Sequence, residues 1–104
     1  MQDKLKNTAT DQLFEAISLL QTPEECYQFF EDICTIKEIL SFTQRFQVAQ
    51  MLRGNKVYTE ISKETGASTA TISRVKRALN YGTDGYDLVI KRLNAVHSTD
   101  SKEG

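Results

Sequence analysis

The chain has 104 residues, of which 39% are hydrophobic and 26% are charged, and its formal net charge is −1. This length suits one domain with one core, and the composition is that of a globular protein rather than a disordered or fibrous one. No run approaches the roughly 18 consecutive apolar residues of a membrane span, and residues 1–7 lack the apolar core of a signal peptide. We therefore expect a cytoplasmic protein with no membrane partner.

Apolar residues recur at helical spacing along the chain, and no segment shows the sustained alternation of a half-buried strand. The sequence therefore predicts an all-α fold of about six helices, in a single domain over residues 1–97. The last residues, 98–104, are small and polar, and we expect them to be a disordered tail.

Two helices are predicted in the first third of the chain. The first ends before Thr22 and places four apolar residues on one face: Leu13, Phe14, Ile17 and Leu20. The second begins at Thr22, Pro23 and Glu25, because threonine and glutamate form a capping box and proline suits the first helical position. The second helix is predicted to bury Cys26, Phe29, Phe30 and Ile33. Cys26 and Cys34 lack the spacing of a metal or redox site, and we interpret both as reduced core thiols.

A long third helix is predicted to begin at a second capping box, Thr35 and Glu38, and to end at Arg53, with Gly54 as the left-handed residue that stops it. Its apolar residues lie around most of the helical circumference rather than in one stripe. A chain of this size has few helices to surround such a helix, so a core shared by two chains is favoured over a central helix in a monomer. The residues are Ile36, Ile39, Leu40, Phe42, Phe46, Val48, Ala49, Met51 and Leu52.

Residues 58–80 have the pattern of a helix-turn-helix. The pattern predicts two short helices that cross steeply, one near Tyr58–Thr65 and one from Thr69 to Asn80. Such a crossing requires a small residue where the helices touch, a turn residue that tolerates positive φ, and an apolar residue that packs between the helices. Ser62, Gly66 and Ile72 fill these roles in order. A generic pair of antiparallel helices is the alternative interpretation. Further inward-facing apolar residues are Ile61, Ala67 and Val75.

A turn at Gly82 precedes the last predicted helix, which would bury Tyr86, Val89, Ile90 and Leu93. His97, the only histidine, follows near the tail, and no set of catalytic or metal-ligating residues accompanies it. We therefore expect neither an enzyme nor a metal site.

Basic residues gather at the helix-turn-helix although the whole chain is nearly neutral. Residues 44–80 contain seven basic and two acidic residues, whereas residues 1–43 contain three basic and eight acidic ones. A nucleic-acid site concentrates lysine and arginine in this way. A solvated charged face is the alternative, but it does not explain why the basic excess coincides with the motif. The outward side of the second helix also has short polar side chains, which can approach base edges in a groove.

Two segments, VAQMLRG at 48–54 and TGASTATISR at 65–74, resemble the Trp repressor family and in particular its YerC-like branch. The resemblance extends roughly from residue 35 to 93. It implies an intertwined homodimer with interlocking long helices, acting as a repressor that binds double-stranded DNA at a palindromic operator. The family's base-facing and phosphate-contacting positions, with their basic neighbours, predict a DNA-binding set of Lys56, Tyr58, Thr59, Ser68, Thr69, Ala70, Thr71, Ser73, Arg74, Lys76 and Arg77.

The corepressor site of the family transfers poorly to this chain. Tryptophan-responsive members hold the ligand with two arginines and a serine. Arg74 matches the second arginine, but Gln44 replaces the first and Ala78 replaces the serine. Loss of a charged partner and a hydroxyl predicts that tryptophan is not the effector. No cofactor is predicted, although the sequence leaves open a small-molecule effector other than tryptophan. The alternative function is a dimeric protein-interaction adaptor that does not bind DNA.

Overall fold

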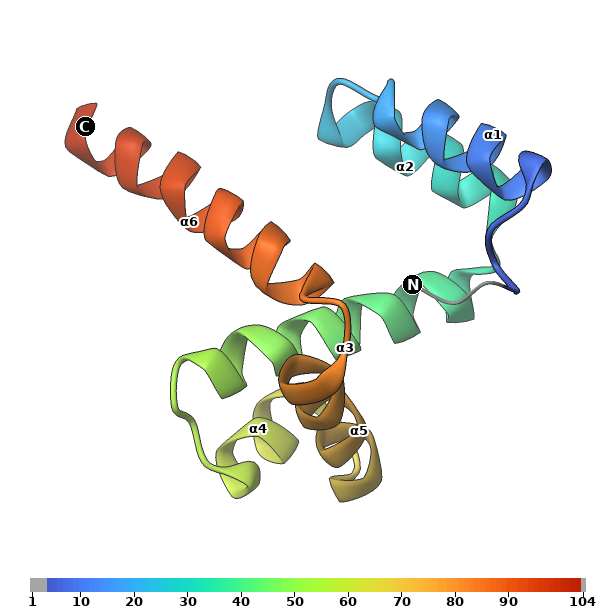
Figure 1. Ribbon diagram of the computed structural model, residues 1–104. Coiled ribbons are helices and arrows are strands. Elements are labelled where there is room, and N and C mark those ends of the chain that lie inside the picture. The colour runs from blue at the N-terminus through green and yellow to red at the C-terminus, as the bar shows by residue number, and fades with distance from the viewer. Residues whose placement is uncertain (1–3, 104) are drawn as a thin grey trace. The chain divides into compact units, whose positions relative to one another are not determined.

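The computed structural model describes residues 4–103, with side chains to residue 98, and contains six helices and no strand within that part of the chain (Figure 1). The all-α prediction is confirmed. The chain divides into two compact units, Met1–Ile39 and Leu40–Gly104, each described by itself below. Among the described residues no helix is both long and apolar enough to cross a bilayer. The helices are α1 (Thr8–Ser18), α2 (Pro23–Ile33), α3 (Ile36–Arg53), α4 (Tyr58–Thr65), α5 (Thr69–Tyr81) and α6 (Gly85–Glu103).

Both predicted capping boxes are present. At α2, the Thr22 hydroxyl accepts a hydrogen bond from the Glu25 N–H (3.1 Å), and the Glu25 carboxylate accepts one from the N–H of Gln21 (2.8 Å). At α3, the N–H groups of Thr35 and Glu38 each donate to the other residue's side chain, at 2.8 and 3.1 Å. The Thr35 N–H therefore lowers the pKa of the Glu38 carboxyl.

The end of α3 differs from the sequence prediction in one residue. The helix ends at Arg53 as predicted, but the left-handed residue is Asn55, with φ 62°, rather than Gly54. The Lys56 N–H donates to the Met51 carbonyl and the Asn55 N–H donates to that of Leu52, which is the Schellman pattern of helix termination. Asparagine tolerates the left-handed conformation, so the glycine beside it is not required for the turn.

The first unit buries less than the sequence predicts. Phe14 is 60% exposed, Ile33 is 51% exposed and Cys26 is exposed, whereas Cys34 is half-buried, so neither thiol is a core thiol. The prediction that Cys26 and Ile33 are buried and that both cysteines are core thiols is therefore wrong for the chain taken by itself. The reason is size, because two helices of eleven residues and one turn of a third cannot cover both apolar faces. Leu13, Ile17, Leu20, Phe29 and Phe30 are half-buried.

The core lies in the second unit, where the C-terminal half of α3 meets α4, α5 and α6. Burial of each large aliphatic side chain there stabilises the fold by about 1.5–3 kcal/mol. In the other half of the same helix, Leu40 and Phe42 are exposed. The fully buried apolar side chains of α3 therefore lie only toward its C-terminus. The buried residues are Val48, Ala49, Ile61, Ala67, Ile72, Val75, Leu79 and Ile90.

Helix α6 departs from the prediction in burial and in length. Ile90 is buried and Tyr86 and Leu93 are half-buried, but Val89 is half exposed and its predicted burial is wrong. The helical backbone continues through residues 98–103, the segment expected to be a disordered tail, because no proline or glycine interrupts it before Gly104. Gly104, the last residue of that tail, and residues 1–3 lie outside the described residues.

Candidate nucleic-acid interface

Helices α4 and α5 contact each other and form the predicted helix-turn-helix (Figure 1, yellow to brown). Gly66 has φ 73°, a left-handed conformation that side chains disfavour, and its N–H donates to the Ser62 carbonyl (2.9 Å). The small Ser62 side chain donates its hydroxyl proton to the carbonyl of Ala67 (2.9 Å), which ties the turn to α4. The role predicted for Gly66, a turn residue with positive φ, is confirmed, and that of Ser62 as the small residue at the helix contact stays a prediction.

The inward side of the motif is apolar and tightly buried, as predicted. Ile61 of α4 and Ile72 of α5 have no solvent exposure, and Ala67 and Val75 are nearly as buried. Ile72, Val75 and Leu79 follow the three- and four-residue spacing of one helix face. This face fixes the orientation of α5, so the opposite face points to solvent.

The outward face of α5 contains short polar and basic side chains. Thr69, Ser73 and Arg77 are four residues apart and all exposed, so they form one row along the helix. Lys76 lies beside this row, and its ammonium group is 5.7 Å from the centre of the Tyr58 ring. Of the predicted contact residues, Tyr58 and Thr71 are half-buried, and the exposed ones are Lys56, Thr59, Ser68, Thr69, Ala70, Ser73, Arg74, Lys76 and Arg77.

Ser68 and Thr71 interact at the start of α5. The Ser68 hydroxyl oxygen accepts a hydrogen bond from the Thr71 N–H (3.1 Å), so Ser68 is the N-cap of the helix. The Ser68 hydroxyl also donates to the Thr71 hydroxyl (3.1 Å). Both side chains thus stabilise the beginning of the helix, whereas Thr69 and Ser73 make no side-chain hydrogen bond among the described residues.

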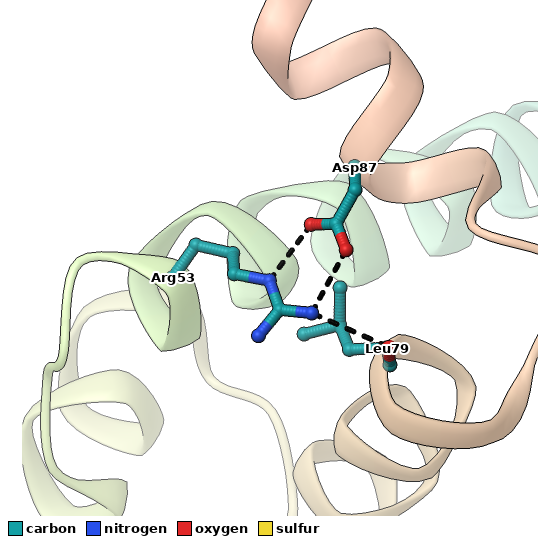
Figure 2. Close-up of polar contacts among 3 residues, drawn as sticks. All are labelled: Arg53, Leu79 and Asp87. Carbon is teal, nitrogen blue, oxygen red and sulfur yellow. Dashed lines mark hydrogen bonds and ion pairs between the residues drawn. The ribbon is translucent and has the colours of Figure 1, made fainter.

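One of the basic residues in the 44–80 segment is paired with a carboxylate. Arg53 donates from Nε to Asp87 Oδ1 (2.7 Å) and from Nη2 to Oδ2 (2.9 Å), and Nη2 also donates to the Leu79 carbonyl at 3.3 Å (Figure 2). These hydrogen bonds raise the pKa of Arg53 and lower the pKa of Asp87. The six other basic residues of the segment form no ion pair with the side chains described, residues 4–98. The positive charge in the segment that no carboxylate neutralises therefore belongs to these six.

The three positions of the family's ligand site do not line one common hollow among those described. Gln44 donates from Nε2 to the Thr65 carbonyl (3.0 Å) and so ties α3 to the end of α4. Arg74 is exposed, and Ala78 lines a separate apolar hollow of about 500 Å³ with Phe46, Tyr86 and Val89 among others. Neither Gln44 nor Arg74 lines that hollow.

The described residues contain no cluster of side chains of the kind that holds a metal ion. No group of three or more histidine, cysteine, aspartate or glutamate side chains is placed to hold an ion in that part of the chain. The exposed face of α5 offers hydroxyl, amide and cationic side chains, which bind by hydrogen bonding and charge, whereas the carboxylates of the motif, Glu60 and Glu64, lie on α4.

Comparison with known proteins places the chain in a family. Residues 8–94 match the model of the Trp repressor protein family. The chain belongs to the Trp repressor family. Among its relatives in this family is the uncharacterized protein YerC of Bacillus subtilis (strain 168), which is 52% identical over 101 residues, 97% of each chain. The resemblance read from the sequence is thereby confirmed.

Solved structures support the same assignment. A TrpR-like protein from Eubacterium eligens ATCC 27750 is 60% identical and has a TM-score of 0.87, with 89% of this chain and 96% of that chain covered. A structure from Staphylococcus aureus is 54% identical with a TM-score of 0.87, and 90% of this chain and 95% of that chain are covered. The Trp repressor fold therefore applies to nearly the whole chain.

Two residues near the interface are absent from the predicted set. Asn80 lies four residues after Lys76 on α5, so helical spacing alone could have placed it on the same face. Asp87 is 34 residues from Arg53 in the sequence, and no local pattern signals their pairing.

Proposed function

We propose that this member of the Trp repressor family is a transcriptional regulator, a repressor that binds an inverted-repeat operator in double-stranded DNA as a homodimer. Helix α5 would enter the major groove and α4 would lie across the backbone. The single observation that carries this proposal is the division of α5 into a buried apolar face and an exposed face of hydroxyl and basic side chains.

The exposed face suits DNA for two physical reasons. Thr69, Ala70 and Ser73 are short, so the helix can approach base edges closely, and the hydroxyls can donate to or accept from them. Arg74, Lys76 and Arg77 follow toward the C-terminal half of the helix, where cations would meet phosphates and release counterions.

Homodimer formation is supported by the apolar side chains that the single chain leaves uncovered. Ile36 is 76% exposed in the first unit, and Leu40 is 62% exposed in the second. Several such residues occur in each unit, which is more than isolated surface apolar residues usually account for. A second copy of the chain would cover them.

Tryptophan is not the effector in this proposal. The Gln44 amide, which stands where responsive members have an arginine, is already hydrogen-bonded to Thr65. Ala78 has no hydroxyl to offer a ligand. The Gln44–Thr65 bond connects α3 directly to the end of α4, so in this proposal DNA binding does not depend on tryptophan.

Selection from a pool of random duplexes, followed by binding measurements over a salt series, tests the proposal. We expect enrichment of an inverted repeat, with half-sites about one helical turn apart, and an affinity that falls steeply as salt rises. A dimer that retains no duplex at low salt would contradict DNA binding and favour the protein-interaction adaptor.

A further inference from the structure

A polar hollow of about 320 Å³ lies where the end of α3 and the following turn meet α4 and α5. Three of its lining side chains are cationic, two are asparagines, and none is a carboxylate. A hollow of this composition offers several hydrogen-bond donors and a positive field to one ligand. The lining residues are Leu52, Arg53, Asn55, Lys56, Tyr58, Lys76, Leu79 and Asn80.

The cation on the α5 side of the hollow is held in place by an aromatic ring. The Lys76 ammonium lies 5.7 Å from the centre of the Tyr58 ring, within the range of a cation–π contact. Asn80 is one helical turn further along α5, so its amide lies on the same side as the lysine. Neither Lys56 nor Lys76 is paired with a carboxylate among the side chains described.

Arg53 also lines the hollow, and Asp87 orients it. Nε and Nη2 of the guanidinium are used by Asp87 and the Leu79 carbonyl. Figure 2 shows that these contacts fix the plane of the group and that Nη1 points away from Asp87. Nη1 makes no hydrogen bond within the described part of the chain, so it is available to a ligand as a preoriented donor.

We propose that this hollow binds a phosphate group, with Arg53, Lys76 and Asn80 as its ligands. Asp87 acts as a positioning residue that orients Arg53. The inference rests on the proposed function, in which the group is a phosphodiester of the DNA backbone next to α5. A free phosphate-bearing molecule has the same chemistry, and the experiment separates the two sources.

Asn80→Asp is the main variant, because it replaces a neutral donor with a carboxylate inside the hollow. Asn94→Asp is the matched control, since it makes the same change at an exposed position of α6 outside the hollow. We expect Asn80→Asp to weaken binding of the full chain to random-sequence duplex DNA about tenfold or more, while Asn94→Asp changes it little. Thermal unfolding of both variants checks that the fold is kept.

Two further variants test the individual cations. Lys76→Ala should lower the salt dependence of DNA binding by roughly one unit of slope, whereas Lys91→Ala, outside the hollow, should leave the slope unchanged. Arg53→Lys keeps the charge but loses the fork that contacts Asp87 and the ligand together, so it should weaken binding.

Asp87→Asn tests whether Asp87 acts by positioning Arg53 or only through its negative charge. Removal of a negative charge should strengthen DNA binding, whereas loss of a positioning group should weaken it, and we expect weakening.

Inorganic phosphate is the second probe, followed through the side-chain NMR signals of Arg53 Nε and the Asn80 amide. Saturable shifts that Asn80→Asp abolishes would identify a free phosphate as an accepted ligand. Absence of such shifts, together with the expected DNA results, would assign the hollow to the backbone phosphodiester alone. If Asn80→Asp changes neither DNA binding nor phosphate binding, the hollow is not a phosphate site. Failure of the wild-type chain to bind any duplex would instead contradict the proposed function.

Discussion

Gly66 and Gly54 each follow a helix, but only Gly66 has a left-handed backbone. An alanine at Gly66 would meet no close neighbour except the Gln44 amide at 3.9 Å, so its cost comes from φ alone. We expect Gly66→Ala to destabilise the protein by about 1–2 kcal/mol. Each kcal/mol corresponds to a decrease of about 4–8 °C in Tm for a domain of this size.

Gly54→Ala is the control for that measurement. Its added methyl group would lie 3.5 Å from the Met51 carbonyl, an ordinary contact, and no positive φ opposes it. We expect no loss of stability, or a gain of about 0.4–1 kcal/mol from the unfolded state. Thermal unfolding followed by circular dichroism at one protein concentration checks both variants. Equal destabilisation by the two alanines would mean that Gly54, as the sequence suggested, is the residue that ends α3.

Gln44 bears on ligand specificity at the scale of a single residue. Its amide donates to the Thr65 carbonyl. It stands at the position where tryptophan-responsive family members have a ligand-binding arginine. Titration calorimetry with tryptophan should therefore show no saturable heat at millimolar ligand, the same result as with leucine as a control. Micromolar binding of tryptophan would show that other side chains rebuild the site.

At the scale of elements, the capping box of α3 predicts a specific pH dependence. The Thr35 N–H lowers the pKa of Glu38, so this carboxylate stabilises the fold at neutral pH. The contribution is complete above the ordinary glutamate pKa of 4.5 and is lost as pH falls through the lower pKa of the folded state. Glu38→Gln cannot titrate. We expect wild type to be more stable than this variant at pH 7 and the difference to shrink below about pH 4.5.

Chemical denaturation of both proteins over a pH series measures that difference. The Asp87 carboxyl, whose pKa Arg53 lowers, also loses its contribution in acid, but it does so in both proteins and cancels in the comparison. A difference that stays constant from pH 7 to pH 3 would show that Glu38 is not coupled to the helix terminus.

Helix α5 is expected to separate specificity from affinity along its exposed row. Ser73→Ala removes a short hydroxyl positioned for a base edge, so it should change the preferred half-site and alter nonspecific binding little. Arg77→Ala should weaken binding to all sequences about equally and lower the salt slope by roughly one unit. Sequence selection with both variants over a salt series provides the measurement. The orientation of α5 in the groove would be wrong if Arg77→Ala changed the preference and Ser73→Ala did not.

Most helix positions could be predicted from the sequence because their signals are local. The boxes at Thr22 and Thr35 and the glycine at position 66 each act within a few residues, and the structure contains all three. Burial was predicted less well, since helical spacing shows which side of a helix is apolar but not whether the chain itself covers that side. The pairing of Arg53 with Asp87, and the hollow that Arg53 lines, depend on contacts distant in sequence and left no local signal.

For the whole molecule, the uncovered apolar side chains are the strongest indication of how it assembles. Among the side chains described, the core of the second unit contains eight buried residues, all from Val48 to Ile90. Leu40 and Phe42, on the same helix as Val48, lie outside this core and are exposed. A long helix with one half packed and the other half apolar but bare suits a shared core, in which a second chain covers the bare half.

The last prediction is therefore that the full chain is an obligate dimer whose stability depends on protein concentration. Sedimentation should give a dimer at micromolar concentration, and the unfolding midpoint should rise with concentration because folding and association are linked. Leu40→Glu places a charge on the bare half of α3 and should produce monomer or unfolded chain, because an unpaired charge is costly to bury. Ser41→Glu adds the same charge at the neighbouring exposed polar position and should leave most of the protein dimeric. A folded wild-type monomer with a concentration-independent transition would refute the shared core, and so would a dimer that Leu40→Glu leaves unchanged.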